Sequence, residues 1–342
     1  MGDDFAIPKM MTALVLHGKE DLRFEERPVP APGPGKILLE VRSVGVCGSD
    51  KHLYFEGHDS SAILTDPVVL GHEFGGRVVA LGDGVPEAML GRRVSVEPQM
   101  PCRQCRQCRE GLYNLCPNVQ FFGVPGTDGA LQEYLEVPLE NVFPIPDEVS
   151  DDAAAVVETI SVSLWGGHRG NIEPGHDVLV TGAGPVGLFA IQVARLRGAD
   201  RVVAVEPQAS RREWAARLGA TTVADLSEAG GPFDVLMECS GVESVRHDAA
   251  LLVVPNGRAV FIGVGLQAAP VPMPAVIERE VSIVGVMRYR FTWPSVINAI
   301  ARGQYVVDDL VSRRVPFTDA ITAWTAKEYF ATEVKTIIRV NE

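Results

Sequence analysis

The chain has 342 residues, of which 46% are hydrophobic and 22% charged, and its formal net charge is −13 at pH 7. This length exceeds what a single core usually supports, so we expect two domains. The acidic balance argues against nucleic acid or an anionic membrane as the main partner, and no apolar run reaches the roughly 18 residues of a membrane helix. Because no signal-peptide pattern precedes the six cysteines, we expect a cytoplasmic protein.

Residues 11–146 are predicted to form short strands. Alternating apolar runs such as KILLEVRSVGV and GGRVVALG are separated by Gly and Pro, which is typical of a barrel-like or partly open all-β domain. Cys47 ends one apolar run and His72 follows another. Together with Glu158 they could ligate a metal ion. Taken singly, each also has an ordinary interpretation as a buried small residue, a hydrogen-bonded histidine or a helix-surface carboxylate.

The segment PCRQCRQCREGLYNLCPN, at 101–118, predicts a structural zinc site. Two C-x-x-C steps share a cysteine and a fourth cysteine follows, and four thiolates at such spacing suit a tetrahedral zinc ion. Disulfides are the alternative, but overlapping C-x-x-C steps rarely close local bridges, and a redox pair would leave two cysteines unused. No further ligand suggests an open position, so this metal is expected to stabilise the domain. The four ligands are Cys102, Cys105, Cys108 and Cys116.

After a helix predicted at 151–167, capped by Ser150 or Asp151, strands and helices alternate from residue 177. This alternation predicts a parallel, doubly wound sheet. The strand DVLVT leads into GAGPVG at 182–187 and then into an apolar helix. In such a β–α–β unit the glycines let the backbone approach a pyrophosphate at the helix N-terminus, so the loop predicts a dinucleotide site.

Glu206 ends the next strand and indicates which dinucleotide is bound. A carboxylate there accepts hydrogen bonds from both ribose hydroxyls and repels a 2′-phosphate, which favours NAD over NADP. Arg211 and Arg212 complicate this preference because either could meet a phosphate, although an arginine at such a place more often stacks on adenine.

The C-terminal part is predicted as a helix, a strand, a final helix at 318–330 and the strand KTIIRV. We expect this part to return to the β-rich domain, so that the α/β domain is an insertion. The expected domain boundaries are 1–157, 158–297 and 298–342. The apolar strand at 280–286 ends the α/β pattern and is expected to be a sheet edge that pairs with a second copy.

These motifs resemble the zinc-dependent medium-chain dehydrogenase/reductase family, and most of all its sorbitol (polyol) dehydrogenase branch. The resemblance runs from residue 12 to the end and includes C-G-S-D-x-H, G-H-E, the cysteine loop, the glycine loop, and Arg288-Tyr289 followed by Thr292-Trp293-Pro294. It implies a GroES-like β-rich catalytic domain with an inserted Rossmann domain. The implied enzyme uses zinc and NAD to interconvert a secondary alcohol of a sugar alcohol or cyclitol and the ketone by hydride transfer, and it is a homodimer or homotetramer.

The resemblance also implies roles for single residues. Cys47 and His72 match ligands of a catalytic zinc, whereas Glu73 binds that metal directly or stands just behind it. Glu158 falls where the polyol branch has a glutamate, but Thr159 replaces the family's proline, which leaves open how Glu158 approaches the metal. Asp50 matches a residue that orients the metal-binding histidine. Ser49 and His52 match a proton relay.

The remaining implied site residues face the cofactor or the substrate. Those on the cofactor side are Gly182, Gly184, Pro185, Val186, Gly187, Glu206, Arg211, Val264, Met287 and Arg288. Those on the substrate side are Tyr54, Phe121, Phe122, Arg288 and Tyr289. The expected partner is a small-molecule polyol or alcohol.

Two other functions stay open at this point. The chain could be another alcohol, butanediol or threonine dehydrogenase of the same superfamily, because the loop 53–66 and the residues near Arg288 decide between substrates. It could also be a non-catalytic NAD-binding zinc protein. The joint presence of the candidate metal and relay residues speaks against this second reading, and the zinc content of the protein would separate the two.

Overall fold

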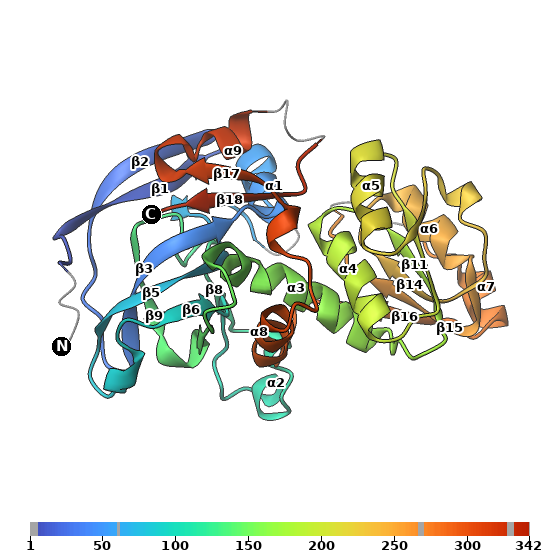
Figure 1. The fold of residues 1–342 in the computed structure, drawn as a ribbon, viewed down its shortest axis with the longest axis horizontal. Helices are drawn as coiled ribbons and strands as arrows, with labels where there is room; N and C mark the ends of the chain where they lie inside the picture. Colours follow the sequence, from blue (N-terminus) through green and yellow to red (C-terminus); the bar gives the residue numbers. More distant parts are fainter. Residues whose placement is uncertain (1–5, 60–61, 266–269, 327–331, 342) are drawn as a thin grey trace. The chain divides into compact units, whose positions relative to one another are not determined.

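The computed structural model describes residues 6–59, 62–265, 270–326 and 332–341. The chain forms two compact units. Unit 1 comprises the chain up to Glu158, Trp293–Gly303 and the chain from Val307, and unit 2 comprises Thr159–Thr292 and Gln304–Val306. Both termini belong to unit 1 (Figure 1), so unit 2 is inserted into it.

The chain returns to unit 1 at Trp293, earlier than the boundary after residue 297 that the sequence indicated. Helix α8 (Trp293–Ala301) belongs to unit 1, although residues up to 297 were expected in the inserted domain. The reason is the indole of Trp293, which is fully buried, donates a hydrogen bond to Ser95 Oγ at 3.0 Å and lies 6.0 Å from the ring of Phe143.

The sheets of unit 1 are largely antiparallel. The larger sheet has the order β10-β6-β5-β3-β18-β17, with β9 also paired to β3, and a smaller one has the order β2-β1-β4. The strands of unit 1 are β1 (Met10–Gly18), β2 (Asp21–Pro28), β3 (Lys36–Gly45), β4 (Val68–Val69), β5 (Glu73–Leu81), β6 (Arg93–Val96), β7 (Gln99–Met100), β8 (Gln120–Phe121), β9 (Tyr134–Pro138), β10 (Val142–Pro144), β17 (Val311–Pro316) and β18 (Lys335–Arg339). Its other helices are α1 (Gly48–Glu56), α2 (Arg106–Arg109), the first half of α3 (Asp151–Arg169) and α9 (Thr322–Thr325).

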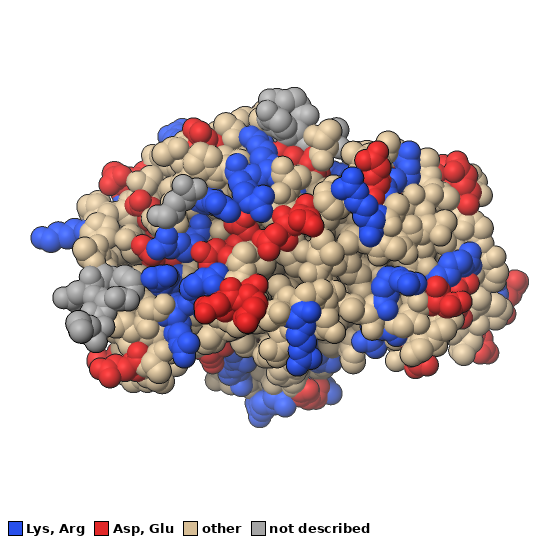
Figure 2. Space-filling model, viewed as in Figure 1, with Lys and Arg blue, Asp and Glu red and all other residues tan. Residues whose placement is uncertain are grey.

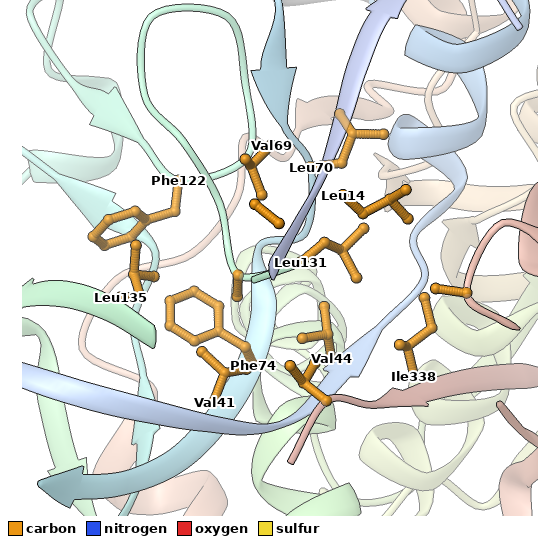
Figure 3. Close-up of a cluster of buried hydrophobic side chains, with 14 of the residues drawn as sticks. Leu14, Val41, Val44, Val69, Leu70, Phe74, Phe122, Leu131, Leu135 and Ile338 are labelled. Carbon is orange, nitrogen blue, oxygen red and sulfur yellow. The ribbon is translucent and has the colours of Figure 1, made fainter. Parts of the chain in front are cut away.

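The core of unit 1 lies between these strands. Figure 3 shows Leu14 of β1, Val44 of β3, Phe74 of β5 and Ile338 of β18 gathered in one apolar cluster, and none of them is more than 1% exposed. Burying each such side chain contributes about 2 kcal/mol. Because successive side chains in a strand point to opposite faces, the anchoring of Phe74 in the core turns its neighbour Glu73 to the other face of β5.

Unit 2 has the predicted parallel sheet. Its strand order is β13-β12-β11-β14-β15-β16, every neighbouring pair is parallel, and β16 is an edge strand, as expected. Helices α4, α5 and α6 cover the sheet (Figure 1). The elements are β11 (Asp177–Thr181), α4 (Pro185–Leu196), β12 (Arg201–Val205), α5 (Ala209–Arg217), β13 (Thr221–Val223), β14 (Phe233–Glu238), α6 (Glu243–Ala250), β15 (Val253–Phe261), α7 (Met273–Glu278) and β16 (Ser282–Gly285).

Two helix predictions can be checked here. Helix α3 is capped by Ser150, whose Oγ accepts a hydrogen bond from the Ala153 N–H at 2.9 Å, so the serine and not Asp151 is the cap. The single helix predicted at 318–330 is wrong in its first part. A 3-10 turn at Phe317–Asp319 precedes the short α9. Trp324 of α9 is buried in the core of unit 1. Residues 327–331 of this prediction lie outside the described residues.

Charged side chains of both signs lie on the surface. On the face drawn in Figure 2, Lys and Arg side chains are interspersed with Asp and Glu. Among the helices of the described residues, none combines the length and the apolar character that crossing a membrane requires.

Candidate active site

Three candidate metal ligands meet at one end of the larger sheet of unit 1. Cys47 follows β3 and is the N-cap of α1, His72 immediately precedes β5, and Glu73 is the first residue of β5. Gly45 at the end of β3 pairs with Glu73, so these chain ends lie side by side. One ligand atom from each of Cys47, His72 and Glu73 lies within 4.8 Å of the other two. A thiolate, an imidazole and a carboxylate in this grouping suit zinc.

Asp50 connects two of these ligands. Its Oδ2 accepts a hydrogen bond from the backbone N–H of Cys47 at 3.1 Å, and its Oδ1 lies 3.3 Å from Nδ1 of His72. The Nδ1 edge of the ring is thus turned to Asp50, which leaves Nε2 for a metal ion, as metal-binding histidines usually require. Asp50 therefore stands where the resemblance placed it.

The electrostatics of this cluster suit a cation. Burial alone lowers the pKa of His72, but the negative charges of Asp50 and Cys47 outweigh burial and raise the pKa well above its ordinary value. Asp50 and His72 are shielded from bulk water, since they are 1% and 6% exposed, and Cys47 is half-buried. The thiol, imidazole and carboxylate donors of this cluster fit a bound divalent metal ion.

Lys335, at the start of β18, belongs to the same cluster, and sequence reasoning missed it. Its side chain is 3% exposed, its Nζ contacts Glu73 Oε2, and it donates a hydrogen bond to the Val46 carbonyl at 3.2 Å. Burial lowers the pKa of Lys335, but Glu73 and Cys47 raise it above its ordinary value. The signal was a lysine opening the apolar strand KTIIRV, where a buried position is expected.

Glu158 stands apart from the three closest ligands. It lies on α3, is 6% exposed and acts electrostatically on Lys335. Among the described residues, the cluster within 4.8 Å consists of Cys47, His72 and Glu73 without Glu158. Of the two glutamates, Glu73 is therefore the nearer to the other ligands.

Ser49 and His52 lie on α1, three residues apart and thus on the same side of the helix, and both are half-buried. Phe121 is also beside the cluster, with its ring 5.4 Å from that of His72. Phe122 and Tyr54, predicted on the substrate side, belong to the apolar core cluster of unit 1. Phe122 packs edge-on against Phe74, and Tyr54 is 4% exposed in the same apolar cluster.

The cysteine loop forms a second cluster. The sulfurs of Cys102, Cys105, Cys108 and Cys116 all lie within 4.8 Å of one another. Sγ–Sγ separations of 3.5 and 3.8 Å from Cys116 to Cys102 and Cys105 are far longer than a disulfide bond, and all four thiols are free. Backbone hydrogen bonds lower the pKa of Cys102 to about 6, whereas burial raises that of Cys108 to about 12. Four sulfurs in this arrangement suit a structural zinc ion.

The glycine loop of unit 2 has the geometry that a dinucleotide requires. Gly182 follows β11 with φ of 82°, and a Cβ there would lie 2.9 Å from the Cα of Ser240. A Cβ on Gly187 would lie 2.9 Å from the carbonyl carbon of Gly182. Gly184 is the N-cap of α4, and Pro185 and Val186 open the helix. The free N–H groups of this helix start are available to a pyrophosphate.

Glu206 lies beside this loop. Its Oε2 accepts a hydrogen bond from the Ala183 N–H at 2.8 Å, and its Oε1 accepts one from the Gln208 N–H at 3.0 Å. Arg212 is directed elsewhere, since its Nη1 donates to the carbonyls of Glu206 and Pro207, both at 2.7 Å. Of the two arginines that could meet a phosphate, Arg212 is thus engaged with the backbone. Arg211 lies on α5 and is half-buried.

The other predicted cofactor and substrate residues follow strands of unit 2. Val264 comes after β15, and Met287 and Arg288 come after β16, at the same edge of the sheet as the glycine loop. Val264 is 48% and Met287 40% exposed, so both are open to a ligand. Tyr289 has no exposed surface, so the predicted substrate contact of this side chain has no support in the structure.

Comparison with known proteins defines the class. Residues 33–147 match the family model described as "Alcohol dehydrogenase GroES-like domain", and residues 185–302 match the one described as "Zinc-binding dehydrogenase". The chain belongs to the zinc-dependent medium-chain dehydrogenase/reductase family and is an oxidoreductase with a GroES-like domain and a Rossmann domain. Its cofactors are zinc and a nicotinamide dinucleotide.

The chain is similar to three dehydrogenases over most of its length. Sorbitol dehydrogenase of Macaca fascicularis is 36% identical over 332 residues, with 93% of each chain covered. The solved 2R,3R-butanediol dehydrogenase of Bacillus subtilis is 31% identical with a TM-score of 0.88, covering 97% of this chain and 100% of the other. An alcohol dehydrogenase of E. coli CFT073, solved in complex with NADH, is 27% identical with a TM-score of 0.90 and the same coverage. The family identification made from the sequence motifs is therefore confirmed.

Proposed function

We propose that the protein oxidises a secondary alcohol of a polyol to the ketone, and catalyses the reverse reaction, with NAD as the cofactor. The observation that carries this proposal is the cluster of Cys47, His72 and Glu73 within 4.8 Å, with Asp50 against the imidazole. Three donors and one orienting carboxylate suit a catalytic metal, because a fourth position is left for substrate.

In this proposal Cys47, His72 and Glu73 hold zinc, and Glu158 acts through a water molecule. Zinc bound there supplies Lewis acidity, which lowers the pKa of an alcohol. Ser49 takes the alcohol proton and passes it toward His52, which lies on the same side of α1. Phe121 forms an apolar wall beside His72. Gly182, Gly184 and Gly187 admit the pyrophosphate of the cofactor.

Two lines of support favour a polyol. Relatives 34 to 36% identical over most of the chain are sorbitol dehydrogenases. Arg288 lies in the segment that resembles the polyol branch, and a guanidinium can donate hydrogen bonds to additional hydroxyl groups. A second candidate function is butanediol oxidation, favoured by the fold similarity to the Bacillus subtilis butanediol dehydrogenase.

A substrate panel with the variants Arg288→Ala and Arg288→Lys separates these candidates. We expect the wild-type protein to oxidise at least one sugar alcohol with NAD more efficiently than 2,3-butanediol or threonine. Arg288→Ala should reduce kcat/KM for the polyol by about tenfold or more and leave simple secondary alcohols nearly unchanged, because only polyols lose a hydrogen-bonded hydroxyl. Arg288→Lys keeps a hydrogen-bond donor, so its kcat/KM for the polyol should lie between those of the wild type and Arg288→Ala. Good turnover of 2,3-butanediol with none of any sugar alcohol would contradict the polyol assignment.

We further propose that unit 2 mediates assembly into a homodimer or homotetramer. The edge strand β16 exposes Ile283 at 42%, and the adjacent α7 exposes Ile277 at 69% and Met273 at 50%. An unpaired strand edge with apolar neighbours favours association with a second copy across a two-fold axis. Sedimentation at micromolar concentration should show at least twice the 36.9 kDa of one chain, and a monomer would exclude this assembly.

The cellular compartment that we propose is the cytoplasm. Support comes from the cysteines of unit 1, all of which are free and grouped as metal ligands. Thiolate ligands of this kind persist in a reducing compartment, where disulfides are rare.

A further inference from the structure

Glu238, the last residue of β14, carries a buried charge that the activity described so far does not use. Its carboxylate has no exposed surface, and its Oε2 accepts a hydrogen bond from Nε of Arg246 on α6 at 3.1 Å. The guanidinium group is itself largely buried. Because taking two charges out of water often costs as much as their attraction returns, a buried pair is weak evidence for a purely stabilising role. The role of this pair therefore lies in the groups that it holds in place.

The second oxygen of Glu238 holds the loop that follows β14. Its Oε1 accepts hydrogen bonds from the backbone N–H of Ser240 at 2.7 Å and from that of Gly241 at 2.8 Å. The Ser240 hydroxyl donates to the same oxygen at 2.5 Å, and the Thr181 hydroxyl, at the end of β11, does so at 3.4 Å. One carboxylate thus fixes this loop and ties it to the strand that leads into the glycine loop.

Arg246 extends this network to the loop that follows β15. Its Nη2 donates a hydrogen bond to the carbonyl of Gly263, the residue before Val264. Since its Nε is bound to Glu238, the guanidinium group bridges the loops that follow two neighbouring strands. A guanidinium group presents several N–H donors in fixed directions, so it is suited to such a bridge, whereas an ammonium group is a single compact donor.

The three loops at this edge of the sheet pack backbone against backbone. A Cβ on Gly182 would lie 2.9 Å from the Cα of Ser240. A Cβ on Gly241, whose φ is 71°, would lie 2.5 Å from the carbonyl oxygen of Val264. The loop held by Glu238 therefore contacts the glycine loop on one side and Val264 on the other. Loops at the carboxyl ends of parallel strands are where a dinucleotide binds in such a sheet.

We propose that Glu238 and Arg246 are positioning residues, which fix the loops after β14 and β15 in the conformation that binds the nicotinamide dinucleotide. Glu238 holds the loop beside the glycine loop, and Arg246 carries this order to Val264, the residue expected at the nicotinamide end. Loops that are ordered before binding spare the cofactor the cost of ordering them, which raises its affinity. The inference goes beyond the polyol assignment and needs only the cofactor class that the family defines.

The test is Arg246→Lys in the intact, zinc-loaded protein, because lysine keeps a positive charge beside Glu238 and lacks the fixed fork that reaches Gly263. Fluorescence titration measures the dissociation constants of NADH and NADPH, and calorimetry measures that of ADP-ribose, which has no nicotinamide. Binding of the preferred dinucleotide should weaken by about fivefold or more, and binding of ADP-ribose by less than about twofold. KM for the cofactor should rise in parallel while kcat changes by less than about threefold, because the loop reorders in the complex.

Glu238→Gln is the second variant, and it keeps the inference falsifiable if Arg246→Lys does not fold. Glutamine has nearly the same shape and keeps an acceptor for the N–H groups of Ser240 and Gly241, but it removes the charge that holds Arg246. Binding of the preferred dinucleotide should weaken by about tenfold or more, and ADP-ribose should also bind more weakly, because the loop beside the glycine loop is less firmly held.

Asp234→Asn is the matched control on the same strand. Asp234 lies near the opposite end of β14, where its Oδ2 accepts a hydrogen bond from the Asp177 N–H at 2.8 Å. This variant should lower the melting temperature and leave each dissociation constant within about twofold of the wild type, since it acts away from the cofactor edge. Hydrogen exchange without cofactor should be faster at residues 239–241 in Glu238→Gln and at 263–265 in Arg246→Lys, and unchanged there in the control.

The outcomes separate this inference from the proposed choice of NAD. Folded Arg246→Lys and Glu238→Gln proteins that bind the preferred dinucleotide as the wild type does would overturn it. So would an equal loss of affinity in Asp234→Asn, or an Arg246→Lys protein that loses as much affinity for ADP-ribose as for the dinucleotide, because either would show a general disturbance of unit 2. A wild type that binds NADPH and not NADH would contradict the NAD assignment alone, since the same comparison of variants is then made with NADPH.

Discussion

At the scale of single residues, we expect the choice between NAD and NADP to depend on Glu206. Its carboxylate accepts hydrogen bonds from the N–H groups of Ala183 and Gln208, which fixes it beside the glycine loop. At this position a negative charge favours the ribose hydroxyls and repels a 2′-phosphate.

The variants Glu206→Gln and Glu206→Ser test this assignment. Glu206→Gln keeps an acceptor for Ala183 and removes only the charge, so it should relax discrimination against NADP with little loss of stability. Glu206→Ser should relax discrimination further, by about tenfold or more in the ratio of kcat/KM values, because it also makes room for a phosphate. The measurement is kcat/KM for both cofactors. A wild-type protein that already prefers NADP would show that Glu206 has another role.

The residues that sequence reasoning placed well are those whose partners are close in the chain. Cys102, Cys105 and Cys108 are brought together by local turns, and Asp50 reaches Cys47 within one turn of α1. The direction of the Tyr54 and Phe122 side chains could not be predicted in this way, because a motif gives only the residue type, and both belong to the apolar core of unit 1.

At the scale of the elements, Asp152 ties helix α3 to the sheet of unit 1. Its carboxylate is 4% exposed and accepts hydrogen bonds from Arg314 of β17 at 2.7 Å, Arg339 of β18 at 3.0 Å and Ser43 of β3 at 2.9 Å. Burial raises the pKa of Asp152, but these hydrogen bonds outweigh it and hold the pKa below its ordinary value. The carboxylate is therefore a stabilising group only while it is ionised.

Asp152→Asn should lower the free energy of unfolding at pH 7 by about 2 kcal/mol, because hydrogen bonds to a buried charge are lost. Since the folded-state pKa is lowered, this contribution is complete above the unfolded pKa of about 4 and disappears as the pH falls through the folded value. Urea unfolding at pH 7 and at decreasing pH measures this contribution to the free energy of unfolding. Asp151→Asn is the matched control, because the partly exposed pair of Asp151 with Arg93 contributes about 1 kcal/mol at most. A difference between wild type and Asp152→Asn that does not shrink in acid would contradict this account.

Pairing between distant elements explains why Lys335 could not be predicted. The strand KTIIRV was predicted, but its place beside β3 depends on contacts across almost the whole chain, such as Ile337 with Gly45. Only this pairing brings Lys335 to Glu73. The α/β half of the fold was easier to predict, because alternating strands and helices determine a parallel sheet without knowledge of distant partners.

At the scale of the whole molecule, the two units divide the chemistry. Unit 1 carries both candidate metal clusters, and unit 2 carries the glycine loop and Glu206. A change in one metal cluster should therefore leave cofactor binding by unit 2 intact. This separation allows metal content, cofactor binding and turnover to be measured independently on the same preparation.

The most direct test of the central claim is the zinc content of wild type, Cys47→Ala and Cys105→Ser, measured together with turnover. We expect two zinc ions per chain in the wild type, one for each cluster. Cys47→Ala should keep one zinc ion and bind NAD, but lose turnover by about a thousandfold or more, because the Lewis acid is missing. Cys105→Ser should lose the other ion and lower the melting temperature, because three thiolates cannot complete the tetrahedron. If Cys47→Ala keeps both zinc ions, or turns over substrate at the wild-type rate, the assignment of the catalytic metal site is wrong.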